Sequence, residues 1–312
     1  MRQWFYAAFA SFLILLGALP AQAADGEICT TVRLAEAGWL DVSLTSNVVA
    51  EVLQALGYTP DVRLFSLEII FAGLENKDLD VFLGDWRPSV DPYSKPYIDR
   101  GTIERISLNL TGAKYTLAVP KYVADAGVKD FADLSKFGDK FNRMIYGIEP
   151  GSNESTLKMV AEGKFGLADW TVKESSEGGM MAQVDKTYRN QEWIVFQAWE
   201  PHPMNKQYDI VYLTGGDEVF GPNLGAATVN TITRKGYLDE CPNAGKLLSN
   251  VKFELDFENA GMELISKNGL SAKDAAMQMI RENPQLILGW LSGVTTADGK
   301  DAKPALSAAF GY

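Results

Sequence analysis

The chain has 312 residues, of which 46% are hydrophobic and 22% charged, and its formal net charge at pH 7 is −11. This composition is typical of a globular protein with a sizeable core. The acidic balance argues against nucleic acid or an anionic membrane surface as a partner.

The N-terminus has the pattern of a secretory signal peptide. Arg2 precedes an apolar run from residue 5 to residue 19, and Ala21-Gln22-Ala23 supplies the small residues that signal peptidase requires. The run is shorter than the roughly 20 residues of a membrane-spanning helix. We predict a signal peptide over 1–23, cleaved after Ala23, and a periplasmic protein. Cleavage leaves 289 residues, and loss of Arg2 changes the formal charge from −11 to −12.

The chain contains two cysteines, Cys29 and Cys241. An exported protein meets an oxidising compartment, so we expect these cysteines to form one disulfide. Together with a single histidine they do not suggest a zinc site. The bond would bring the C-terminal third of the chain back to the first domain.

The first part of the chain predicts a βαβαβ unit. A helix with an apolar stripe is expected to start at Asp41 as its N-cap and to end at Gly57. The other elements are strands at 32–35, 62–65 and 80–83 and a helix at 67–75. This order indicates a mostly parallel sheet flanked by helices.

A second α/β unit follows. It comprises strands at 115–119, 144–148, 193–198 and 210–213, a short helix at 131–137 and a helix at 155–162. Helices around 247, 260–266 and 271–280 complete the chain. We expect two hinge crossovers, near Thr111 and Thr214, and therefore lobe 1 over 24–111 plus 214–312 and lobe 2 over 112–213.

Aromatic side chains gather at predicted strand ends. Trp39, Trp86 and Trp199 each follow a strand, Tyr115 opens another, and Asp41 lies two residues after Trp39. In open α/β sheets the ligand lies beyond the carboxyl ends of the strands. A fully methylated ammonium ion donates no hydrogen bond, so a protein holds it against aromatic faces with negative charge nearby. The pattern therefore predicts a site for a small quaternary amine, above all choline.

Each candidate also has a plainer structural reading. Aromatic side chains usually fill cores, and Tyr115 lies inside a β-rich run from which it could simply face the core. Asp41 could serve only as an N-cap, and Asn153 could cap the helix near Ser155. His202, between two prolines, is assigned to the surface or to the space between the lobes.

Three segments carry a resemblance to a known family: Gly84-Asp85-Trp86, Gly151-Ser152-Asn153-Glu154 and Ala198-Trp199-Glu200-Pro201-His202. They resemble the substrate-binding proteins of ABC importers for glycine betaine, proline betaine and choline, and the whole set is most similar to periplasmic choline-binding proteins. The resemblance covers essentially the whole mature chain.

This resemblance implies a two-lobed, hinge-closing receptor that delivers its ligand to a membrane permease powered by a cytoplasmic ATPase. It implies an aromatic box without cofactor or metal, and we expect a monomer. On this sequence the box comprises Trp39, Trp86, Tyr115 and Trp199. Asp41 supplies the negative charge, and Asn153 contacts the hydroxyl end of the ligand.

Charge favours choline over betaine, because a betaine carboxylate needs basic side chains or free amides. Arg87 beside Trp86 and the amides after Gly151 could hold such a carboxylate, so glycine betaine stays an alternative ligand. Acetylcholine and carnitine are further alternatives. A choline-ester hydrolase would also want an aromatic cage. The sequence contains no Gly-x-Ser-x-Gly and no His-Glu-x-x-His motif, which argues against an enzyme.

Overall fold

The structure is a computed structural model that describes residues 25–312. The expected signal peptide and its cleavage site lie outside the described residues. Within 25–312, none of the helices is both long and apolar enough to cross a membrane.

One nine-stranded sheet runs through both halves of the molecule in the order β2-β1-β3-β9-β4-β7-β5-β6, with β8 paired to β4. Strands β2, β1 and β3 are parallel at one end, and β7, β5 and β6 are parallel at the other. The antiparallel strands β9 and β4 join the two sets. The strands are β1 (Thr31–Glu36), β2 (Thr59–Leu64), β3 (Val81–Arg87), β4 (Ile103–Pro120), β5 (Met144–Tyr146), β6 (Thr171–Lys173), β7 (Val195–Glu200), β8 (Ile210–Tyr212) and β9 (Ala226–Arg234).

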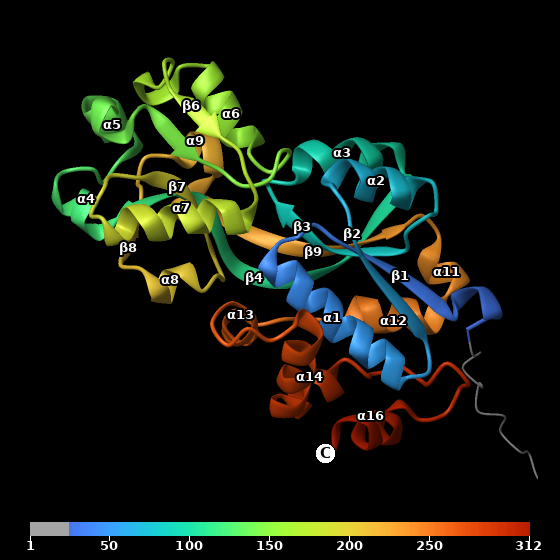
Figure 1. The fold of residues 1–312 in the computed structure, drawn as a ribbon. Helices are drawn as coiled ribbons and strands as arrows, with labels where there is room; N and C mark the ends of the chain where they lie inside the picture. Colours follow the sequence, from blue (N-terminus) through green and yellow to red (C-terminus); the bar gives the residue numbers. More distant parts are fainter. Residues whose placement is uncertain (1–24) are drawn as a thin grey trace, which may run out of the picture.

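Helices cover the sheet in two groups, which Figure 1 shows as two lobes joined by β4 and β9. The first lobe carries α1 (Leu40–Ala55), α2 (Leu67–Glu75), α3 (Asp91–Arg100), α11 (Tyr237–Glu240), α12 (Pro242–Asn250), α13 (Leu255–Ser266), α14 (Ala272–Glu282), α15 (Pro284–Gly289) and α16 (Ala302–Phe310). The second carries α4 (Lys121–Asp125), α5 (Phe131–Leu134), α6 (Glu154–Ala161), α7 (Glu177–Arg189), α8 (Met204–Gln207) and α9 (Asp217–Phe220). Helix α10 (Pro222–Gly225) leads into β9, and short 3-10 helices lie at Glu27–Cys29, Ser135–Phe141 and Lys164–Gly166. The predicted two-lobed α/β class is confirmed.

The start of α1 differs from the sequence prediction. The N-cap position belongs to Trp39, so Asp41 lies in the first helical turn and the prediction that it is the N-cap is wrong. A carboxylate in the first turn still faces the positive end of the helix dipole. Asn153 does occupy the N-cap position of α6, but its side chain makes no capping bond there.

Contacts near the expected second crossover lie mostly with the second lobe. The Thr214 amide donates to the Lys129 carbonyl at 2.9 Å, and the Phe220 ring lies 5.6 Å from that of Phe131. The next strand, β9, pairs with β3 of the first lobe. The residue boundaries of the lobes stay a prediction.

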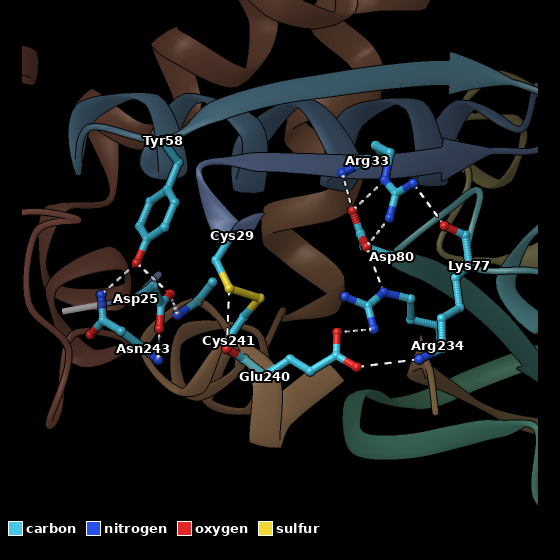
Figure 2. Close-up of a disulfide and its surroundings, with 11 residues drawn as sticks. Asp25, Cys29, Arg33, Tyr58, Lys77, Asp80, Arg234, Glu240, Cys241 and Asn243 are labelled. Atoms are coloured by element: carbon cyan, nitrogen blue, oxygen red, sulfur yellow. Dashed lines mark hydrogen bonds and ion pairs between the residues drawn. A yellow bond between two sulfur atoms is a disulfide. The ribbon is translucent and has the colours of Figure 1, made fainter. Parts of the chain in front are cut away.

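A disulfide between Cys29 and Cys241 ties the N-terminal segment to the start of α12 (Figure 2). Beside it, the Asp25 carboxylate accepts hydrogen bonds from the amides of Asn243 and Ala244, both at 2.8 Å, and from the Tyr58 hydroxyl. The C-terminal helices are thus fastened to the first lobe, as the cysteine pairing predicted.

Candidate functional site

A small cavity lies between the two lobes. Among its lining side chains, all within 25–312, Asp41 is the one that carries a charge. The lining residues are Trp39, Asp41, Trp86, Ser89, Val90, Tyr115, Ile148, Ser152 and Trp199. The structure therefore brings together the four aromatic residues and the aspartate that the sequence singled out.

Strand geometry explains how these side chains meet. Trp86 lies near the end of β3, and Trp39 directly precedes α1. Tyr115 of β4 and Trp199 of β7 are directly paired in the antiparallel register. Paired residues project to the same face of a sheet, and the two ring centroids lie 6.5 Å apart.

Three of the aromatic side chains are held by hydrogen bonds. Trp86 Nε1 donates to Asp41 Oδ2 at 2.8 Å, and Trp39 Nε1 donates to Glu149 Oε2 at 3.2 Å. The Tyr115 hydroxyl donates to the Ser152 carbonyl oxygen at 2.7 Å. The Trp86 and Tyr115 bonds each lie within one lobe, so they hold these two rings before a ligand arrives and leave little conformational freedom to lose on binding. The Trp39 bond joins the two lobes.

Asp41 is buried and forms no salt bridge with any residue in 25–312. Burial, reinforced by the charge of Glu177, raises the pKa of Asp41 to about 6 although the Trp86 indole lowers it. Glu258 on α13 is also buried, and burial together with the Asp41 charge raises its pKa well above the usual range. Within residues 25–312 the cavity lining contains one carboxylate and no basic side chain, which favours a positive charge in the cavity.

Asn153 is committed to the loop that precedes α6. Its Oδ1 accepts from the Ile148 amide at 2.9 Å. Its Nδ2 donates to the carbonyls of Ile148 and Glu149 and to Glu174 Oε1. From this loop, Ile148 and Ser152 line the cavity instead. A ligand contact of Asn153 stays a prediction.

Ser152 is a cavity residue that sequence reasoning missed. Its Oγ is buried and has no hydrogen-bond partner within the described structure. Ser89, Val90 and Ile148 were missed as well. Their residue types carry no distinctive signal, although Ser152 lies in the turn that the sequence placed before a helix.

His202 lies in the interior beside the aromatic box, whereas Arg87 lies at the surface. His202 is 4% exposed and packs edge-on against Trp199, with the ring centroids 4.8 Å apart, so it is buried rather than on the surface. Arg87 pairs with Asp91 at 2.8 Å, is largely exposed and does not line the cavity. Arg87 is thus turned away from the cavity.

Comparison with known proteins places the chain clearly. Residues 30–282 match the family described as the substrate-binding domain of ABC-type glycine betaine transport systems. A solved ABC-transporter choline-binding protein in complex with choline is 45% identical, with a TM-score of 0.90 over 92% of this chain and 100% of that chain. The lactococcal OpuAC, solved closed with glycine betaine, is 26% identical, with a TM-score of 0.75 over 84% of this chain and 99% of that chain.

Among curated relatives, an uncharacterized protein, ORF1, of Chromohalobacter salexigens is 50% identical over 147 residues, which are 47% of this chain and 94% of that protein. The glycine betaine/carnitine transport binding protein GbuC of Listeria monocytogenes is 28% identical over 168 residues, 53% of this chain and 55% of that protein.

The fold, two lobes that enclose a small aromatic cavity, is that of a substrate-binding protein of ABC transporters. The chain belongs to the family of substrate-binding domains of ABC-type glycine betaine transport systems.

Proposed function

We propose that this protein captures choline in the cavity between its lobes, in the periplasm, and delivers it to the permease of an ABC importer. The observation that carries the proposal is the buried carboxylate of Asp41, which faces an aromatic cavity and forms no salt bridge within residues 25–312. Trp39, Trp86, Tyr115 and Trp199 would hold the trimethylammonium group, and Asp41 would balance its charge.

Magnitudes favour the aromatic faces as the main source of affinity. A desolvated cation gains up to about 2 kcal/mol from an aromatic face. A micromolar complex needs about 8 kcal/mol. An exposed ion pair contributes about 1 kcal/mol or less. Several faces and one carboxylate together reach the required range after the costs of association.

Choline fits the cavity better than a betaine does. A betaine carboxylate would lie among lining residues that include Asp41 and no basic side chain. The free Ser152 Oγ offers a hydrogen-bond partner to a hydroxyl group. Similarity to a protein solved with choline supports the same choice. Glycine betaine, acetylcholine and carnitine are the alternatives.

Isothermal titration calorimetry of the mature protein tests the proposal, with choline, glycine betaine, acetylcholine and carnitine under identical conditions. We expect choline to bind tightest and glycine betaine much more weakly. Tight betaine with weak choline would assign the protein to betaine uptake. Recovery of unchanged acetylcholine after incubation would separate a receptor from a choline-ester hydrolase, which would release acetate.

A further inference from the structure

Two carboxylates of the second lobe reach across to the start of α1. Glu177 Oε2 accepts a hydrogen bond from the Leu40 amide at 3.1 Å, and Glu149 Oε2 accepts from Trp39 Nε1 at 3.2 Å. The two are linked, because the Glu177 amide donates to Glu149 Oε1 at 2.8 Å. Neither glutamate lines the cavity, and both bond to residues that directly precede Asp41 in the chain.

The single histidine fixes the position of Glu177. His202 Nδ1 accepts a hydrogen bond from the Met204 amide at 3.0 Å, which assigns the ring proton to Nε2. Nε2 lies 3.1 Å from Glu177 Oε1 and donates to it. Both oxygens of the buried Glu177 carboxylate are therefore used, one by His202 and the other by α1.

We propose that Glu177, held by His202, is a positioning residue that fastens the lobes over the ligand and sets how slowly the ligand leaves. The Leu40 amide is among the first four of α1, which have no acceptor within the helix. A carboxylate at that end is also favoured by the helix dipole. Because the bond joins α7 to α1, it is made when the lobes are closed. This inference rests on the proposed trapping of a ligand between the lobes.

The test is a stopped-flow measurement of choline association and dissociation, followed by tryptophan fluorescence. In Glu177→Gln, one carbonyl oxygen must serve two donors, so one of the two bonds is lost. We expect koff to rise about tenfold, equivalent to about 1.4 kcal/mol, while kon changes less than about twofold. Glu192→Gln, the same change on an exposed carboxylate of the same lobe, should leave both rates at their wild-type values.

Two substitutions of His202 distinguish its hydrogen bond to Glu177 from its hydrogen bond to the Met204 amide. His202→Asn keeps an acceptor for the Met204 amide but loses the donor to Glu177, and should raise koff as Glu177→Gln does. His202→Gln keeps a donor toward Glu177 and should lie closer to wild type. The double variant Glu177→Gln/His202→Asn should be no faster than the faster single variant, because both remove one interaction.

Glu177→Asp guards against a folding artefact. It keeps a negative charge at the start of α7 but is too short to reach Leu40, so koff should rise while the melting temperature of the free protein stays close to wild type. An unchanged koff in Glu177→Gln, or equal rates in the two His202 variants, would overturn the inference. If wild type binds another of the four amines instead of choline, the rates are measured with that amine. Binding of none of them would remove both the proposed function and this inference.

Discussion

Two buried aspartates of the first lobe show how differently one residue type is used. Asp80 accepts from Arg33 Nη2 at 2.7 Å and from Arg234 Nε at 2.8 Å (Figure 2). Burial pushes the pKa of Asp80 upward, but the two guanidinium groups outweigh it and the pKa is lowered. Asp41 is also buried, and within residues 25–312 its one side-chain donor is the Trp86 indole. Its pKa is raised to about 6.

The difference separates scaffold from site. Around Asp80 the protein supplies its own cations, beside the disulfide that ties the C-terminal helices to the sheet. Around Asp41 it supplies aromatic faces and, within residues 25–312, no salt-bridge partner. A buried carboxylate without a partner costs stability, which is a cost that binding of a cation offsets.

The largest expected effect is the loss of stability when Asp80 is replaced. Asp80→Asn removes the carboxylate that Arg33 and Arg234 share and leaves the buried Arg234 with the more exposed Glu240 as its remaining carboxylate, and we expect the free energy of unfolding to fall by about 3 kcal/mol. Choline affinity of the folded variant should stay within about twofold of wild type. Urea denaturation measures the first and calorimetry the second. Asp61→Asn, in an exposed pair with Arg63, is the control and should cost about 1 kcal/mol or less. A strong loss of choline affinity in Asp80→Asn would contradict the separation.

On the site side, Trp199→Ala removes one wall of the cavity. We expect choline binding to weaken by about 2 kcal/mol or more, roughly 30-fold, because the aromatic face and the exclusion of water are lost together. Calorimetry measures the change. Trp290→Phe, a buried position that does not line the cavity, should leave the affinity unaltered. An unchanged affinity in Trp199→Ala would remove that residue from the box.

Asp41→Asn should weaken choline binding without lowering stability, the opposite of what we expect for Asp80→Asn. We expect choline to bind about tenfold more weakly, with a smaller loss for glycine betaine, which carries its own negative charge. The unfolding free energy of the free protein should stay equal or rise, because a buried unpaired charge has been removed. Equal losses for both ligands would mean that Asp41 acts only on the structure of α1.

The smallest expected effect is a dependence of choline affinity on pH. The pKa of Asp41 in the folded protein is raised to about 6, so its charge is present above that pH and lost as pH falls through it. Choline affinity should therefore be nearly constant above about pH 7 and weaker by about fivefold at pH 5, where about one Asp41 in ten is still ionised. Glu177, His202 and Glu258 also face this region, so Asp41→Asn is the control that should flatten the profile.

Much of the site could be predicted because strand ends are visible in sequence. Trp86 and Trp199 follow apolar runs, and parallel strands bring their carboxyl ends to one edge of a sheet. Strand β9 was not predicted, since its alternation of alanine, threonine and asparagine with a few apolar residues gives a weak signal. Helix α7 was missed too, because Gly178 and Gly179 lower the helix propensity of its first turn.

The supporting contacts could not be predicted, because they depend on tertiary structure alone. Glu177 lies 137 positions from Leu40 and 25 from His202, and no local pattern links them. Asn153 illustrates the opposite difficulty: its place before a helix suggested a ligand contact or a cap, whereas the structure uses all its polar groups within the loop and with Glu174.

The most direct test of the central claim compares choline with 3,3-dimethylbutan-1-ol, which has the same shape but carbon in place of the charged nitrogen. Calorimetry on the wild-type protein should give an affinity for choline at least about 100-fold higher, because the aromatic faces and Asp41 act on the charge. Equal affinities would mean that the cavity recognises shape and apolar surface, and would contradict the role assigned to its unpaired carboxylate.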